Sequence, residues 1–152
     1  MESPDHTRSG KAAAVITMRL PSKMAHAEVI EQFEDIEDYA TIAIVTNGTE
    51  TVQLNRLKIS GIGDFADGIY TSEKVGATKP NKQIFLAALK DFGIENNSKV
   101  LVVGDRLQSD IKGGINAGLD TCWVNFDGEE NTTNIKPKYE VRDYMQLKNI
   151  VL

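Results

Sequence analysis

The chain has 152 residues, 41% of them hydrophobic and 26% charged, and a formal net charge of −5 at pH 7. This size and apolar share predict one globular domain with its own core, spanning 11–152 after a flexible tail at 1–10. The acidic balance argues against nucleic acid as a partner, because no basic stripe is present. A small phosphorylated ligand or inorganic phosphate could still bind in a locally positive pocket.

A single cysteine, Cys122, excludes an internal disulfide and is typical of a reducing compartment, so we expect a cytoplasmic protein. No apolar run approaches the roughly 18 residues that a membrane span requires, so we expect no membrane partner. The oligomeric state stays open. A homo-oligomer would cover apolar surface that a small sheet leaves exposed.

Apolar runs with strand character alternate along the chain with helical patterns. This alternation predicts an α/β fold, a three-layer Rossmann-like core with a mainly parallel sheet. The expected strands are 12–18, 41–46, 68–71, 100–103 and 121–124. Five helices are expected: one after Ser22, one over 50–59, one after Pro80, one that starts near Ser109 and one over 143–152. A long polar loop is expected over 127–138.

Polar residues follow the expected strand 100–103 at its carboxyl end, where open α/β sheets bind ligands. Gly104 and Asp105 come first, and Asp110 lies one turn into the next helix. Two converging carboxylates are hard oxygen ligands that suit Mg²⁺. The alternative is a turn residue followed by a first-turn acid that the helix dipole favours.

Two further clusters occupy similar places. Thr46 ends its strand, and Asn47-Gly48 then turn the chain into a helix, so a hydroxyl and backbone N–H groups could cradle a phosphate. An ordinary Asn-Gly turn is the alternative. Lys79 precedes Pro80, which keeps it out of helical geometry on the rim. Its ammonium could neutralise a phosphoryl group, or it could simply be solvated.

The order, spacing and strand context of these three clusters resemble motifs two, three and four of the haloacid dehalogenase superfamily. The resemblance covers about 41–125, including the small residues of 113–118, and its nearest branch is that of phosphatases similar to pyrimidine 5′-nucleotidases. It implies Mg²⁺-dependent hydrolysis of phosphomonoesters through an aspartyl-phosphate. It further implies phosphate binding by Thr46, Asn47 and Lys79, catalytic roles for Lys79 and Asp105, and a metal site at Asp105 and Asp110.

The first motif of that family, a strand followed by Asp-x-Asp-x-Thr, does not occur ahead of Thr46. The central strand should nevertheless be filled, because two sheet edges would otherwise be exposed, and 12–18 is the only apolar run available. We therefore expect that this strand is kept while its acids are lost. Arg19 could then pair with Asp105 or Asp110, and Mg²⁺ binding should be weakened.

Leu20 runs almost directly into the helix before Thr41, so the cap domain that selects substrates in this branch is expected to be absent. The sequence therefore predicts no particular substrate. One hypothesis is a phosphatase that is weak or inactive alone. The other is a degenerate, non-catalytic phosphate-binding or protein-interaction domain, and a purely structural oligomerising module is a third class. The chain could be a fragment, a degenerate homologue or half of a site that another chain completes.

Overall fold

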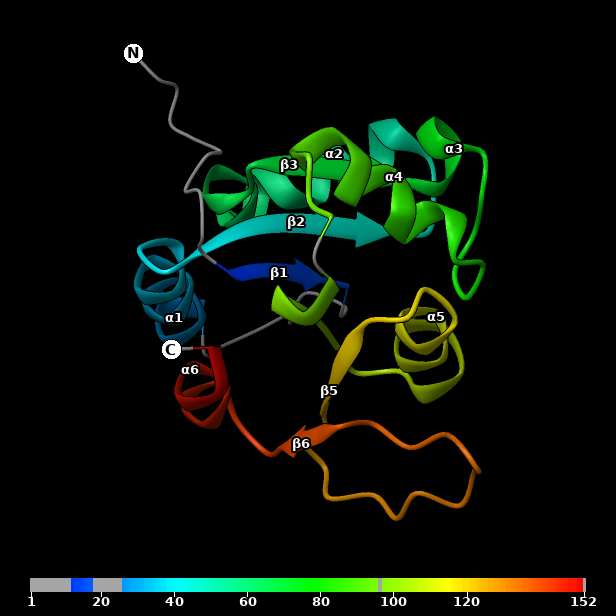
Figure 1. Cartoon of the computed structure of the whole chain (residues 1–152). Coiled ribbons are helices and arrows are strands. Elements are labelled where there is room, and N and C mark those ends of the chain that lie inside the picture. Colours follow the sequence, from blue (N-terminus) through cyan, green and yellow to red (C-terminus); the bar gives the residue numbers. More distant parts are fainter. Residues whose placement is uncertain (1–11, 18–25, 96, 152) are drawn as a thin grey trace.

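The computed structural model describes residues 12–17, 26–95 and 97–151. Six strands form one parallel sheet in the order β3-β2-β1-β4-β5-β6 (Figure 1). The strands are β1 (Ala12–Ile16), β2 (Ala40–Thr46), β3 (Gly68–Thr71), β4 (Val100–Gly104), β5 (Asp120–Val124) and β6 (Tyr139–Val141). The predicted α/β class and mainly parallel sheet are confirmed.

The first strand occupies the centre of the sheet. β1 pairs with β2 on one side and with β4 on the other, both in parallel register. The prediction that the apolar run 12–18 fills the central strand is therefore confirmed. Met18 and Arg19 lie outside the described residues, as do the expected tail at 1–10 and Ser22, so the pairing of Arg19 stays a prediction.

Helices connect the strands. They are α1 (His26–Glu37), α2 (Glu50–Ser60), α3 (Ser72–Val75), α4 (Gln83–Phe92), α5 (Lys112–Asn116) and α6 (Tyr144–Val151), with short 3-10 turns η1 (Ile62–Phe65) and η2 (Asn97–Lys99) and a π-helical turn η3 (Leu107–Ile111). Among the helices described, none is long and apolar enough to cross a membrane. The short elements α3 and β6 were not predicted, because four and three residues carry too little periodicity to be recognised.

The sheet is buried on both faces, as its uniformly apolar strands require. Alternate residues of β1 point to opposite sides, so that Ala14 and Ile16 join one core while Ala13 and Val15 join the other. The first core packs under α1 and α6, and the second packs under α4. The helices contribute Phe33, Ile36 and Leu147 to the first core, and Ile84, Phe85, Ala88 and Leu89 to the second.

Two glycines let α5 pack closely against its neighbours, Gly113 against α4 and Gly114 against the sheet. A Cβ atom at Gly113 would come within 2.5 Å of the Phe85 ring, and one at Gly114 would come within 2.8 Å of the Thr121 methyl group. Side chains at either position would push the helix outward and open the core. The sequence prediction that small residues in 113–118 allow close packing is consistent with this contact.

Candidate functional site

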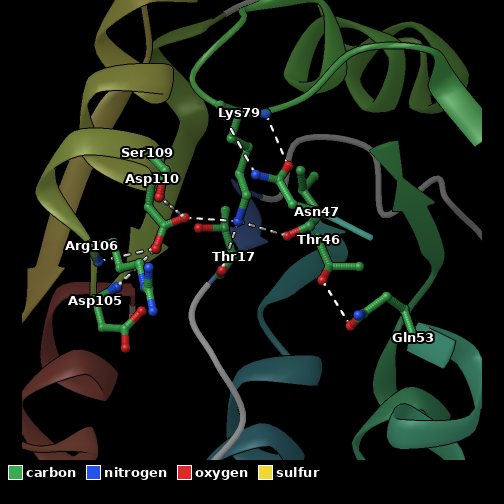
Figure 2. A network of polar contacts seen from close by, with 10 residues as sticks. Thr17, Thr46, Asn47, Gln53, Lys79, Asp105, Arg106, Ser109 and Asp110 are labelled. Carbon is green, nitrogen blue, oxygen red and sulfur yellow. Dashed lines mark hydrogen bonds and ion pairs between the residues drawn. The ribbon is translucent and has the colours of Figure 1, made fainter. Parts of the chain in front are cut away.

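A pocket of about 370 Å³ opens at the carboxyl ends of β1, β2 and β4. This is the edge at which parallel α/β sheets bind ligands, because the loops there diverge around a gap between strands. Residues from all three predicted clusters reach it (Figure 2). Its lining comprises Ile16, Thr17, Ile44, Thr46, Asn47, Gln53, Arg56, Leu57, Lys79, Asp105, Arg106, Ser109 and Asp110.

Lys79 is the centre of the polar network in Figure 2. Its ammonium donates to Asp110 Oδ1 at 2.8 Å, to the carbonyl oxygen of Thr17 at 3.1 Å and to that of Val45 at 3.5 Å. An ammonium has three N–H donors, so these contacts use all of them. Lys79 therefore joins the ends of β1 and β2 to the segment that follows β4.

The carboxylate of Asp110 also has all its hydrogen-bonding positions occupied. Its Oδ1 accepts from Lys79 and, at 3.5 Å, from the hydroxyl of Ser109, while its Oδ2 accepts from the backbone N–H groups of Asp105 at 3.2 Å and Arg106 at 3.1 Å. Four contacts fill the roughly four lone-pair positions of a carboxylate. The side chains of the pair are only 6% and 2% exposed, so removing either partner would leave a buried charge without compensation.

Asn47 holds the backbone of the lysine segment. Its side-chain oxygen accepts from the Lys79 N–H at 2.9 Å, and its side-chain nitrogen donates to the Lys79 carbonyl at 3.5 Å. This two-way bridge fixes the loop after α3 against the end of β2. The amide of Asn47 thus serves the scaffold, while its residue still lines the pocket.

Thr46 presents its hydroxyl at the end of β2. That hydroxyl donates to Gln53 Oε1 at 3.0 Å, and the next turn is held by the Gly48 N–H, which donates to Ser72 Oγ at 2.8 Å. A Cβ atom at Gly48, where φ is +141°, would come within 2.6 Å of Gln53 Nε2. The glycine therefore lets the Gln53 side chain cross the turn and reach Thr46.

Asp105 follows β4 at the rim of the same pocket. Its backbone is fixed from two sides, because its N–H donates to Asp110 and its carbonyl accepts from Trp123 Nε1 at 3.2 Å. The side chain is partly exposed. The structure thus brings Asp105, Thr46 and Lys79 to one pocket, as the sequence predicts, without testing what each does there.

Thr17 directly follows the central strand β1. Its N–H donates to the Val103 carbonyl at 2.8 Å and its carbonyl accepts from Lys79, but its buried hydroxyl has no hydrogen-bond partner among the residues that the structure describes. The resemblance predicts that the stretch from Thr17 to Arg19 lies near the position of the family's carboxylate nucleophile. A threonine there lacks the charge that the covalent step would use.

Sequence reasoning missed four polar residues of the pocket, one of which is Ser109 at the turn after β4. Gln53 and Arg56 come from α2, and Arg106 comes from the segment after β4. The available signal was their position: Gln53 and Arg56 are three residues apart, hence on one helical face, directly after the Asn-Gly turn. With Lys79 and the two aspartates, the described part of the pocket lining has three cationic and two anionic residues, so this part is locally positive in an acidic chain.

The described residues do not fit a magnesium ion held between Asp105 and Asp110. Magnesium requires oxygen ligands in near-octahedral geometry. Across the described ranges, no group of three or more His, Cys, Asp or Glu side chains could hold a metal ion. Asp110 has its lone pairs engaged, and the ammonium 2.8 Å from its Oδ1 would repel a dication.

The chain is similar in sequence to known hydrolases. Residues 11–118 match the family model of haloacid dehalogenase-like hydrolases. The chain is 44% identical over 116 residues to the pyrimidine 5′-nucleotidase YjjG of Escherichia coli, covering 76% of this chain and 52% of that protein. It is 38% identical over 117 residues to the HAD-hydrolase YfnB of Bacillus subtilis, covering 77% and 50%. The chain thus spans about half the length of these relatives.

Solved structures agree in fold. A crystal structure of YfnB from Bacillus subtilis, described as bound to magnesium, superposes with a TM-score of 0.77 and 36% identity over 82% of this chain and 55% of that one. A HAD phosphatase from Thermococcus onnurineus gives a TM-score of 0.73 at 32% identity, over 80% and 55%. The family match covers most of the sheet and the predicted clusters up to Asp110. The chain belongs to the haloacid dehalogenase-like hydrolase family.

Proposed function

We propose that this chain is the phosphate-binding core of a phosphomonoesterase similar to 5′-nucleotidases, and that alone it hydrolyses phosphate esters slowly or not at all. The observation that carries the proposal is the locally positive pocket at the strand ends, where Thr46, Lys79 and Asp105 converge. A phosphate dianion gains most from such a site because the surrounding strands keep the charges fixed in place.

In this proposal, the Thr46 hydroxyl donates to a phosphoryl oxygen after leaving Gln53. Lys79 contributes positive charge from its fixed position, and Asn47 keeps that position by holding the Lys79 backbone. Asp105, at the rim, is the candidate catalytic carboxylate. Asp110 supports Lys79 and the turn after β4, because its lone pairs are already engaged.

A specific observation favours a second candidate, a non-catalytic phosphate-binding domain. The central strand is followed by Thr17, whose hydroxyl has no partner among the described residues that could take its proton. A hydroxyl without a general base is a weak nucleophile at neutral pH. Without an acid from elsewhere, the described residues bind phosphate but do not attack it.

The family suggests the wider setting of this proposal. HAD hydrolases typically use Mg²⁺, and YfnB is described as bound to magnesium. Names of relatives refer to phosphorylated small molecules, among them pyrimidine 5′-nucleotides and glyceraldehyde 3-phosphate. Because the chain matches only about half of YjjG and YfnB, both the substrate and a cytoplasmic location are part of the proposal.

Hydrolysis of p-nitrophenyl phosphate and of nucleoside monophosphates, with Mg²⁺ present, separates the two candidates. We expect little or no turnover, and phosphate binding by calorimetry. Asp105→Asn is compared with Asp120→Asn, an acid on the surface that pairs with Lys138. Turnover lost only in Asp105→Asn supports the enzyme. Binding without turnover supports the non-catalytic domain, and a chain that does not bind phosphate contradicts both.

A further inference from the structure

Two of the three residues predicted to hold phosphate are used by the scaffold. The ammonium of Lys79 donates all its N–H groups to Thr17, Val45 and Asp110. The side chain of Asn47 is bonded at both ends to the Lys79 backbone. Direct contacts to a bound anion must therefore come mainly from other residues.

Two arginines of the pocket are uncommitted. The side chains of Arg56 and Arg106 line the cavity, are exposed to solvent, and form no ion pair or hydrogen bond with any residue in the described ranges. Both charges are thus available to a ligand. A guanidinium also loses less hydration than an ammonium when it pairs with an anion, and its fork of N–H groups matches two phosphate oxygens.

The two arginines belong to different walls of the pocket. Arg56 lies on α2, three residues after Gln53, whose oxygen accepts from the Thr46 hydroxyl. Residues with this spacing lie on one face of a helix, about 5–6 Å apart between their Cβ atoms. Arg106 follows β4, and its backbone N–H is fixed by Asp110. A ligand that contacts Thr46 would therefore lie between Arg106, on the segment after β4, and Arg56, on α2.

Magnesium would be poorly placed in the same pocket. Asp110 is saturated by its four hydrogen bonds, the ammonium of Lys79 lies 2.8 Å from its Oδ1, and Arg106 adds a positive charge to the lining of the same pocket. Like charges at such distances destabilise one another strongly when water is partly excluded. Two arginines, by contrast, match the charge of a phosphate dianion without a metal.

We propose that this pocket binds the phosphate group of a small phosphate ester through the guanidinium groups of Arg56 and Arg106 and the hydroxyl of Thr46, without Mg²⁺. This inference rests on the proposed phosphate-binding function and assigns its ligands. The arginines occupy the role that the metal has in metal-dependent phosphatases, which is to neutralise the phosphoryl oxygens.

Isothermal titration of the whole chain with sodium phosphate tests this assignment, once in EDTA and once in MgCl₂. We expect the same Kd, within about a factor of two, in both buffers. Arg56→Ala and Arg106→Ala should each weaken binding about tenfold or more, as expected for loss of hydrogen bonds to a charged group. Arg56→Lys should lose part of the affinity, because it keeps the charge but not the fork of donors.

Arg142→Ala is the matched control, because Arg142 is an exposed arginine paired with Glu140 and is not part of the pocket lining. Its Kd should equal that of the unmodified chain. Arg56→Gln replaces Arg56→Ala if the alanine variant fails to give the native circular dichroism spectrum.

Three outcomes are distinguishable. Binding that requires MgCl₂ overturns the inference while leaving the phosphate-binding function intact. Equal affinities for Arg56→Ala, Arg106→Ala and Arg142→Ala overturn the role of the arginines. A chain that binds no phosphate in either buffer contradicts the proposed function itself.

Discussion

The two walls of the pocket differ in how firmly they are held. On the side that follows β4, Asp110 is 1% exposed, and its carboxylate accepts from two backbone N–H groups and from Lys79. On the other side, α2 buries only Leu57 and exposes most of its remaining side chains. One wall is a closed network, and the other is a helix held mainly by its ends and one apolar anchor.

This difference separates the residues that hold the pocket in shape from those that can contact a ligand. Lys79 and Asp110, the buried pair at the closed wall, have no capacity left for a ligand without breaking buried contacts, which costs several kcal/mol. Arg106 lies on the same side but is exposed. Residues of the α2 wall can turn toward a ligand at little cost, because few contacts restrain them. The buried residues that the motifs identify, Lys79 and Asp110, therefore mainly build the pocket, and the exposed arginines Arg56 and Arg106 are better placed to recognise what enters it.

The largest effect is expected at the closed wall. Asp110→Ala leaves the ammonium of Lys79 buried without its partner, so the free energy of unfolding should fall by about 3–5 kcal/mol. Urea denaturation followed by circular dichroism measures the change. Asp120→Ala removes one partner of an exposed pair, Asp120 with Lys138, and should cost no more than about 1 kcal/mol. Equal losses in both variants would contradict the comparison.

A smaller loss of stability is expected at Gly104. A Cβ atom there would collide with the side chain of Asp110, which its hydrogen bonds hold in place. Gly104→Ala should therefore lower the free energy of unfolding by about 1–3 kcal/mol, as overpacking usually does. An unchanged urea midpoint would show that the closed wall yields more easily than its hydrogen bonds suggest.

Substitutions on the α2 wall should change the affinity for phosphate more than the stability of the fold. Gln53→Leu removes the acceptor that the Thr46 hydroxyl must leave before it donates to phosphate, so the affinity for phosphate should rise by about three- to tenfold while the melting temperature changes little. Calorimetry and thermal unfolding measure the two quantities. Gln83→Leu, an exposed position on α4 outside the pocket lining, serves as control. A large drop in melting temperature would mean that Gln53 belongs to the scaffold.

The smallest expected effect is on the reactivity of Cys122, in strand β5 of the sheet beside the closed wall. Burial in the apolar core raises the pKa of the Cys122 thiol to about 12, because the thiolate would lose its hydration there. At pH 8 the folded protein should react with an aromatic disulfide reagent far more slowly than the same protein in urea. The difference is followed by absorbance, and rapid labelling of the folded chain would show that β5 is open to solvent.

Much of the fold is contained in local patterns. The apolar run before residue 18 could be assigned to the central strand because a parallel sheet has no other candidate for that place, and Gly61 ends α2 in a left-handed conformation as its position suggests. The short elements α3 and β6 escaped prediction because their residues are held by neighbouring segments and show no period of their own.

The site was predictable in location but not in its contacts. Strand ends and turns place Thr46, Lys79 and Asp105 at one edge of the sheet. The partners of Lys79 come from segments 62, 34 and 31 residues away along the chain, and no local pattern specifies such contacts. Arg56 belongs to an exposed helix face, where a basic residue is usually solvated, so only the pocket distinguishes it from other surface cations.

A crystal structure of the chain grown with sodium tungstate, an electron-dense analogue of phosphate, tests the central claim most directly. We predict an anomalous peak in the pocket between Thr46, Arg56 and Arg106, with the Lys79 to Asp110 ion pair intact. A tungstate bound directly to the Lys79 ammonium, with Asp110 displaced, would contradict the division between a closed scaffold and a recognising wall.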